Sequence, residues 1–467
     1  MNVVKTDTGY ISGMVMGEPG EEVYVYRGIP YAAPPVGDLR WKPPQPPEKW
    51  TGIRECTTFS SAAPQQRPPS SPKLDIPEGE DCLYVNVLTP AKKTDEKLPV
   101  MVWMHGGGYM AGSGNESMFN NLKLPQHDIV LVNVNMRLGV LGLLAHSLLS
   151  KESPNGVSGN YLFLDMIAAL KWVQKNIAAF GGNPNNVTIF GESGGGAKVA
   201  TLLATPLAKG LFHHAICESG SAFPPIAPGK KLKDIERIGK TLFAKLDVNK
   251  EKDPLAAARA LPWQKIMEVD AAITPMTTQP VSKWDGAVDG WVLPDTVANI
   301  FQTGQQNVAS LITCANLGEL TGPGMLVMPW IIPAYSTMLS SEDKAGAKVY
   351  AGIFDQVPTS WGCEGCVSAH AIELPYVFGV VESEQEWIKL YHITGPAGAK
   401  TSTPKISDAD RKVSEAMMKM WAQFARTGDP GLKDEIKWPD WDQTKDRYLY
   451  ITESPEVRSG FSRVAQK

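Results

Sequence analysis

The strongest chemical signal in the sequence is a glycine-rich pentapeptide, Gly-Glu-Ser-Gly-Gly, at residues 191–195. Residues 186–190 before it are β-branched and aromatic and predict a buried strand, while residues 197–203 after it predict the start of a helix. A serine in such a sharp strand-to-helix turn has its hydroxyl exposed, and the flanking glycines permit the crowded backbone. We therefore expect Ser193 to be a nucleophile; a Gly/Ser turn without chemistry is the alternative.

A second candidate for chemistry is the run of three glycines at residues 106–108, which follows the strand-like segment 98–104. When a serine attacks a carbonyl, negative charge develops on the carbonyl oxygen, and hydrogen-bond donors must already point there. Backbone amides in a glycine-rich loop can approach that oxygen because no side chain blocks them. The donors would be the amides of Gly107, Gly108 and Gly194. Taken alone, the three glycines are equally compatible with a flexible loop.

The general base that such a serine needs is predicted to be His370. An imidazole takes the serine proton and later returns it to the leaving group. In strand–turn–helix enzymes of the α/β-hydrolase kind the chain order is serine, acid, histidine, which leaves His370 and His392 among the seven histidines. His392 is expected at an ordinary helix position, and His213 and His214 are expected to pack or hydrogen-bond locally. With an ordinary imidazole pKa of about 6.5, kcat/KM would rise with pH through the near-neutral range.

The acid that orients this imidazole is favoured to be Glu319. It closes the apolar run 308–318, which predicts a strand entering a turn, and catalytic groups of open parallel sheets gather beyond the carboxyl ends of strands. Asp355, which also follows a strand-like run, is the second candidate. Asp285 and Asp289 are more typical of turn carboxylates. Spacing alone gives Glu319 only a modest lead over Asp355.

Two amphipathic segments indicate how a core is built around these residues. Residues 165–180 predict a helix with one apolar stripe that is ended by Gly181. A second predicted helix has Ser407 as its cap, repeats the apolar spacing and ends at Gly428. Buried strands that alternate with such helices indicate an α/β fold, with helices on both faces of a mostly parallel central sheet. No linker, charge block or repeat divides residues 1–467, so a single domain is expected, with loop and helical excursions around the active-site mouth.

The composition limits the classes of partner. The chain is 43% hydrophobic and 20% charged, which is typical of a globular protein with ample core. The formal net charge is −4 and the lysines and arginines are scattered, so no nucleic-acid or anionic-membrane partner is expected. No stretch approaches the roughly 20 apolar residues that span a bilayer. The N-terminus lacks the apolar core of a signal peptide, so cytoplasmic residence is the expectation unless a leader has been removed.

Six cysteines in 467 residues do not indicate a secreted disulfide framework. Cys363 and Cys366 form a Cys-x-x-Cys pair just before His370. Free thiols are favoured there, with a local disulfide as the second expectation. A metal site is the least favoured, because no second ligand pair is evident and a metal would take the lone pair that His370 needs. We therefore expect the chemistry to require neither a metal nor an organic cofactor.

Besides the pentapeptide, a series of short motifs extends over nearly the whole chain, and together they resemble, in content and order, those of the type-B carboxylesterases, a family that includes cholinesterases and bacterial p-nitrobenzyl esterases. The motifs are Tyr-Arg-Gly-Ile-Pro-Tyr-Ala from residue 26, Gly-Asp-Leu-Arg-Trp from residue 37, Glu-Asp-Cys-Leu-Tyr-Val-Asn-Val from residue 80, Phe-Leu-Asp from residue 163, Glu-Ser-Gly-Ser from residue 218, Leu-Pro-Tyr-Val-Phe-Gly from residue 374 and Trp-Ala-Gln-Phe-Ala from residue 421. The resemblance implies an α/β-hydrolase that cleaves small-molecule carboxylic esters through an acyl-enzyme.

The resemblance also implies roles for individual residues. It implies a catalytic triad formed by Ser193, Glu319 and His370. It implies an oxyanion hole formed by the amides of Gly107, Gly108 and Gly194. It implies supporting positions near the triad for Glu192 and Ser219. An amidase, a carbamate hydrolase or an acyltransferase would use the same residues, whereas a non-catalytic cholinesterase-like interaction protein would usually lack a triad member.

The chain departs from the family pattern at two places. Residues 316–320 are Asn-Leu-Gly-Glu-Leu, where the family usually has an aspartate before the glutamate and a glycine after it. In the family, the cysteine of the Glu-Asp-Cys-Leu-Tyr motif often forms a disulfide with an upstream cysteine. Cys82 matches that cysteine, but Cys56 lies several residues before the usual partner position, near Ala63. A Cys56–Cys82 disulfide is therefore left open.

Overall fold

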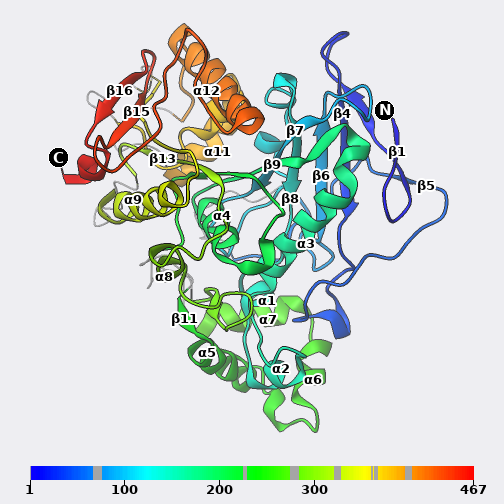
Figure 1. The fold of residues 1–467 in the computed structure, drawn as a ribbon. Coiled ribbons are helices and arrows are strands. Elements are labelled where there is room, and N and C mark those ends of the chain that lie inside the picture. Colours follow the sequence, from blue (N-terminus) through cyan, green and yellow to red (C-terminus); the bar gives the residue numbers. More distant parts are fainter. Residues whose placement is uncertain are drawn as a thin grey trace.

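The computed structural model describes residues 2–66, 76–223, 229–273, 283–319, 328–358, 361, 367–394 and 402–466. Its centre is an eleven-stranded sheet, shown edge to edge in Figure 1. Across the sheet the strands are β16 (Glu456–Ser459), β15 (Arg447–Ile451), β14 (Val349–Phe354), β13 (Ser310–Asn316), β10 (His214–Glu218), β9 (Gly182–Glu192), β7 (Leu98–Met104), β8 (Val130–Val134), β6 (Tyr84–Thr89), β4 (Val23–Pro30) and β3 (Met14–Met16).

Seven neighbouring strands of this sheet, from β15 to β8, run parallel. Antiparallel strands flank them, with β16 on one side and β6, β4 and β3 on the other. The carboxyl ends of β7, β9 and β13 therefore meet at the same edge of the sheet, where parallel sheets carry their sites. This confirms the expected α/β-hydrolase architecture. Two small sheets lie outside it, formed by β1 (Val3–Lys5), β2 (Tyr10–Ser12) and β5 (Ile53–Glu55), and by β11 (Lys230–Lys231) and β12 (Ala287–Val288).

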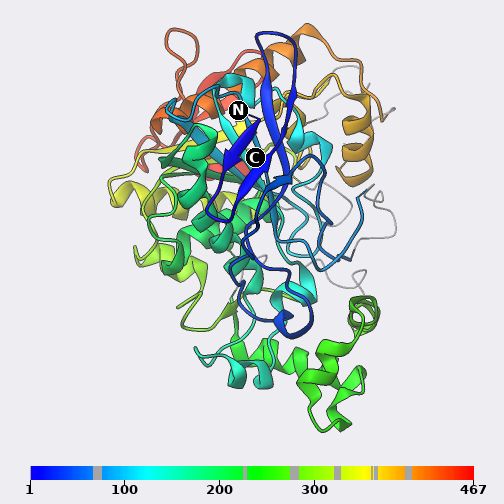
Figure 2. The same cartoon turned by 90° about the vertical axis from the view of Figure 1, so that its right-hand side faces the viewer.

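The helices are short or medium in length and lie on both faces and at one end of the sheet. They are α1 (Gly139–Leu143), α2 (Ser147–Glu152), α3 (Tyr161–Asn176), α4 (Gly194–Ala204), α5 (Leu232–Lys245), α6 (Pro254–Ala260), α7 (Trp263–Ile273), α8 (Val297–Gln302), α9 (Met328–Lys344), α10 (Leu374–Val377), α11 (Glu384–Thr394) and α12 (Asp408–Thr427). Figures 1 and 2 show α5, α6 and α7 gathered at one end of the molecule, away from the central strands.

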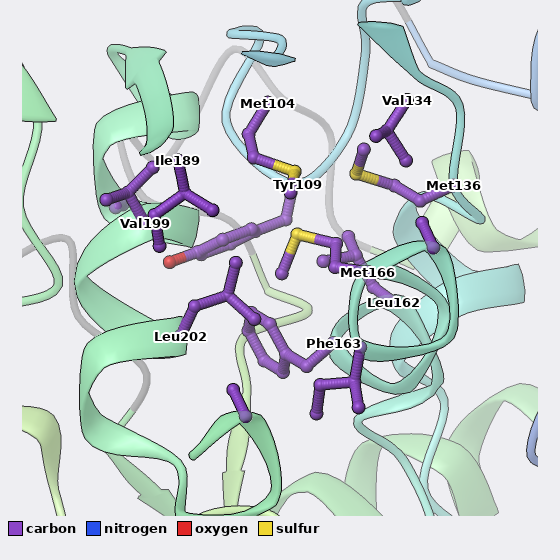
Figure 3. Packing of buried hydrophobic residues seen from close by; sticks show 14 of the residues in the cluster. Met104, Tyr109, Val134, Met136, Leu162, Phe163, Met166, Ile189, Val199 and Leu202 are labelled. Carbon is purple, nitrogen blue, oxygen red and sulfur yellow. The ribbon is translucent and has the colours of Figure 1, made fainter. Parts of the chain in front are cut away.

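Each central strand contributes side chains to two cores, because neighbouring residues of a strand face opposite sides of the sheet. In β7, Val102 and Met104 belong to one core, whereas Met101 and Trp103 belong to the other. Figure 3 shows the first core, in which Met104 lies among side chains of α3 and α4. The second core is closed by α10 and α12. Burial on both faces explains the nearly continuous apolar runs of these strands.

The two helices predicted from apolar spacing are present. α12 has the expected cap, since Ser407 and Asp410 form a reciprocal capping box, and it ends at Gly428 with φ 72°. The helix predicted to begin at residue 165 begins at Tyr161 instead, and a 3₁₀ turn follows it to Gly181. Asp165 therefore lies within the first turns of α3, where its buried carboxylate pairs with Arg137 at 2.6 Å.

The structure bears on the state of the cysteines and on the expectation that no segment spans a membrane. Cys56 and Cys82 are both buried and free, so the disulfide that was left open is not formed. Burial raises the pKa of the Cys56 thiol to about 11, which keeps it protonated at neutral pH. Cys363 and Cys366 lie outside the described residues. Among the helices that the structure describes, none combines the length and the apolar character needed to cross a membrane.

Candidate active site

The predicted nucleophile lies in a strained turn between β9 and α4. Ser193 has φ 57° and ψ −122°, a conformation that costs on the order of 1–3 kcal/mol and persists only where packing enforces it. The packing comes from the end of β7. A Cβ atom added to Gly191 would lie 2.6 Å from the carbonyl oxygen of Met104, and one added to Gly195 would lie 2.0 Å from the same oxygen. The glycines on both sides of Ser193 are therefore required by the close approach of two backbones.

The glycine loop after β7 lies against this turn. Gly107 and Gly108 have φ of 80° and 63°, which favours glycine at both positions. A Cβ atom on Gly194 would lie 2.4 Å from the backbone nitrogen of Gly108, so the three glycines predicted as oxyanion donors are neighbours in space. Tyr109 anchors the far end of the loop, because its ring is buried between α3 and α4 and meets Phe163 edge-on at 5.7 Å (Figure 3).

Glu319 and His370 are brought into direct contact. The imidazole Nδ1 of His370 lies 2.5 Å from Oε2 of Glu319, and the other carboxylate oxygen accepts a hydrogen bond of 2.8 Å from the amide of Asn316. The turn that carries the acid is joined to the histidine segment, since the amide of Gly318 donates to the carbonyl of Ser368 at 2.8 Å. The unusual residues around Glu319 thus leave its carboxylate facing the imidazole.

The other carboxylates that were considered have different partners. Asp355 accepts hydrogen bonds from the amide of Ser368 at 3.0 Å and from the hydroxyl of Tyr450. Asp289 accepts three backbone amides and closes a turn, as expected. Asp285 forms an ion pair of 2.8 Å with Lys230, a contact that the turn interpretation missed.

The remaining histidines are placed as expected. His392 lies within α11. His213 Nδ1 accepts a hydrogen bond from the amide of Val187, and the His214 ring packs against Phe424. Among the histidine rings that the structure describes, that of His370 is the one in contact with a carboxylate that follows a parallel strand.

The second ring nitrogen of His370 faces Glu192. The Nε2 atom lies 3.2 Å from Oε1 of Glu192, the residue directly before Ser193 in the chain. Within the described part of the chain, the Ser193 hydroxyl forms no hydrogen bond with the imidazole. In resting enzymes the contact between nucleophile and base is often loose and tightens with substrate. In this structure the imidazole Nε2 therefore faces the Glu192 carboxylate and is not hydrogen-bonded to the Ser193 hydroxyl.

A second group of buried polar residues, formed by Ser219, Asn316 and Glu373, lies close to His370. Glu373 accepts hydrogen bonds from Ser219 Oγ at 3.1 Å and from Asn316 Nδ2 at 2.6 Å. Burial, together with the nearby charge of Glu319, raises the pKa of Glu373 to about 7. The supporting position implied for Ser219 is thus a contact with Glu373. Sequence reasoning missed Glu373, although a lone carboxylate within the apolar segment 372–379 was a signal for it.

The charges around His370 shift its titration away from the expected range. Burial by itself lowers the pKa of the imidazole, but the carboxylates of Glu192 and Glu319 outweigh this effect and raise it to about 10. Burial also raises the pKa of the Glu192 carboxyl well above its ordinary value. Because the two groups compete for one proton, the apparent pKa belongs to the pair. If His370 is the base, we therefore predict that the rising limb of kcat/KM lies at higher pH than the limb expected for an ordinary imidazole.

Replacing Glu192 with glutamine should move this limb to lower pH. The substitution removes an anion that stabilises the imidazolium, so the pKa of His370 falls and the neutral base is present at lower pH. The measurement is kcat/KM against pH for Glu192→Gln and for the wild type on one nitrophenyl ester. An unmoved limb would show that the charge of Glu192 does not act on the base.

The strand–turn–helix elbow and the mostly parallel sheet define the fold as that of an α/β-hydrolase. The chain belongs to the carboxylesterase family, whose sequence pattern matches residues 1–325 and 325–466. Because its relatives are named esterases and carboxylesterases, the chain is a carboxylic-ester hydrolase. The family that the sequence motifs indicated is thus confirmed.

The relatives that the chain resembles are esterases from bacteria and mammals. It is 40% identical to fumonisin B1 esterase of Sphingopyxis macrogoltabida over 96% of this chain and 86% of that protein. It is 32% identical to para-nitrobenzyl esterase of Bacillus subtilis, over 94% of both chains. Among solved structures, a PNB esterase superposes with a TM-score of 0.83 at 27% identity, over 98% of this chain and 97% of that one.

Proposed function

We propose that this enzyme hydrolyses carboxylic esters through an acyl-enzyme formed on Ser193, with His370 as general base and Glu319 as the orienting acid. The observation that carries the proposal is the 2.5 Å contact between His370 Nδ1 and Glu319 Oε2 at the edge of the sheet where the strained Ser193 lies. A strained residue that packing holds in place is typical of a catalytic position. The buried carboxylate gives the imidazole one orientation and stabilises its charged form.

The proposed reaction proceeds in two halves. Ser193 Oγ attacks the ester carbonyl while His370 Nε2 takes the hydroxyl proton, and Glu319 stabilises the resulting imidazolium. The C–O bond to the alcohol then breaks, and the imidazolium gives the alcohol its proton. In the second half a water molecule takes the place of the alcohol, and His370 takes a proton from it as its oxygen bonds to the acyl carbon. The bond between that carbon and Ser193 Oγ then breaks, the imidazolium returns its proton to Oγ, and the free acid leaves.

The charge that develops on the carbonyl oxygen is proposed to be stabilised by the amides of Gly107, Gly108 and Gly194. The contact between the backbones of Gly108 and Gly194 supports this assignment, because donors for one oxygen must be neighbours. Both segments are rigidly held, by the elbow on one side and by the buried ring of Tyr109 on the other. Preorganised donors of this kind need no rearrangement as the charge forms.

We propose small-molecule carboxylic esters as the substrate class, with fumonisin B1 as the first compound to test. The relative named for that substrate is 40% identical over nearly the whole chain. An amidase, a carbamate hydrolase or an acyltransferase would use the same proposed residues, so these activities are outcomes of the test.

Partitioning of the acyl group between water and methanol tests this function. If phenyl acetate and 4-nitrophenyl acetate form the same acyl-enzyme, the ratio of methyl acetate to acetate must be identical for both, because the leaving group has already departed. A ratio that depends on the leaving group would contradict the acyl-enzyme. Faster turnover of the matching anilide or carbamate would assign the enzyme to one of the alternative classes.

A further inference from the structure

Lys198 is a buried cation that the reaction described above does not use. It is the one charged residue of α4, and its side chain is fully buried. A buried ammonium group is costly unless its protons are hydrogen-bonded. The Nζ atom donates to the carbonyl oxygen of His105 at 2.7 Å and reaches that of Gly106 at 3.4 Å. The ammonium group of Lys198 is thus hydrogen-bonded to the backbone of the glycine loop.

The Gly106 carbonyl belongs to the same peptide as the N–H of Gly107, a proposed oxyanion donor, and the His105 carbonyl belongs to the peptide before it. In a planar trans peptide the C=O of one residue and the N–H of the next point in opposite directions. A Gly106 carbonyl that faces Lys198 therefore directs the amide of Gly107 away from Lys198. The ring Nδ1 of His105 lies 3.0 Å from the same Gly106 oxygen and assists in fixing this peptide.

The helix that carries Lys198 also begins with the third proposed donor, Gly194. An α-helix is stiff over one turn, so Lys198 has a fixed position relative to Gly194 and Ser193. Its hydrogen bonds join the loop after β7 to this helix, across the two backbones that already touch at Gly108 and Gly194. Tyr109 holds the far end of the loop in the core between α3 and α4 (Figure 3).

We propose that Lys198 is a positioning residue, which locks the oxyanion loop to the nucleophile helix and, as a cation, polarises the Gly106–Gly107 peptide. A carbonyl that accepts a charged hydrogen bond makes the N–H of its own peptide a stronger donor. Lys198 therefore acts on the oxyanion through Gly107 and does not touch the substrate. The inference rests on the proposed oxyanion hole and adds to it a residue whose side chain is fully buried.

The protonation of Lys198 should then matter for the rate. Burial lowers the pKa of its ammonium group to about 7, against the opposing effect of the Glu192 carboxylate. The titratable groups around it are His105 in the loop, Glu192 at the end of β9 and His370, which faces Glu192 from the segment after β14. As pH rises through 7 the cation is lost and its polarising effect is lost with it.

The test compares Lys198→Met, which is unbranched and uncharged, with Thr201→Val as the matched control. Thr201 is equally buried one turn further along α4, and its hydroxyl donates to the carbonyl of Ala197 within the helix. Both variants are titrated with a fluorophosphonate so that kcat refers to reactive sites only. Lys198→Met should lower kcat by about 10- to 100-fold with little change in KM, less than the loss of a whole donor, while Thr201→Val keeps the wild-type kcat.

Two further readouts separate positioning from a general loss of structure. The inhibition constant of a trifluoromethyl ketone, which forms a tetrahedral oxyanion on the serine, should rise by the same factor as kcat falls. The ratio of wild-type kcat to Lys198→Met kcat should decrease as pH rises through about 7, because the wild type loses its cation there. Since Lys198 interacts with Glu192, the limb that belongs to the Glu192–His370 pair is first determined for each protein from its own kcat/KM profile.

A kcat per titrated site within twofold of the wild type, a pH-independent ratio or an unchanged inhibition constant would overturn the inference. Failure of the inference and failure of the proposed function are distinguishable. If Ser193→Ala is inactive and Lys198→Met has full kcat, only the role of Lys198 is wrong. If Ser193→Ala keeps its activity, the proposed function itself is wrong.

Discussion

Replacing Ser193 with alanine should lower kcat/KM for ester hydrolysis about a million-fold, as in other triads from which the nucleophile is removed. The substitution leaves the imidazole and the oxyanion donors in place but removes the oxygen that forms the acyl-enzyme. What remains is stabilisation of direct water attack by the oxyanion donors and by substrate binding. The measurement is kcat/KM on 4-nitrophenyl acetate, with protein from a separate expression to exclude wild-type contamination.

Ser221→Ala is the matched control for this variant. Ser221 is fully buried two residues after Ser219, and its hydroxyl has no hydrogen-bond partner among the residues described in the structure. Removing an unpaired buried hydroxyl should not lower the rate. Retention of one tenth of the wild-type turnover by Ser193→Ala would show that the chemistry takes place elsewhere.

Replacing Glu319 with glutamine should lower kcat about 10,000-fold, as for other triads in which the acid is converted to an amide. Glutamine fills the same space, but it does not stabilise an imidazolium and it can hold the imidazole in the wrong tautomer. Among the described residues, Glu319 is the carboxylate that contacts the imidazole Nδ1, at 2.5 Å, whereas Glu192 faces Nε2, so the loss of Glu319 removes the contact that fixes the tautomer.

Asp355→Asn is the comparison that separates the two acids considered from the sequence. Asp355 contacts Ser368 and Tyr450, and its loss should affect stability more than the rate of chemistry. The measurement is kcat for both variants together with their thermal midpoints. A larger loss of kcat in Asp355→Asn than in Glu319→Gln would assign the acid to Asp355.

The fold was predictable from sequence because each signal was local. The apolar run 98–104 is β7 with the expected bounds, and the pattern capped by Ser407 is α12. The start of α3 was misplaced because the charged Asp165 lies inside the helix, where its carboxylate is buried against Arg137, and the apolar spacing alone does not reveal that pair. Only the tertiary contact distinguishes the two.

The residues proposed as the triad were also selected from sequence, since each follows a recognisable strand or motif. Their electrostatics were not predictable. The pKa of His370 depends on Glu192, which approaches Nε2 to 3.2 Å from a segment far away in the chain. Lys198 was read only as part of a predicted helix start, although a single charge among apolar helix residues was the signal that could have found it.

The most direct test of the account is to locate the residue that a fluorophosphonate modifies. Such reagents phosphonylate an activated serine through the same attack that begins ester hydrolysis. We expect one adduct per chain by intact mass, loss of esterase activity in proportion to labelling, and a modified peptide whose fragment ions place the adduct on Ser193. Full inactivation with the adduct on any other residue, or full activity after Ser193 has been modified, would contradict the account.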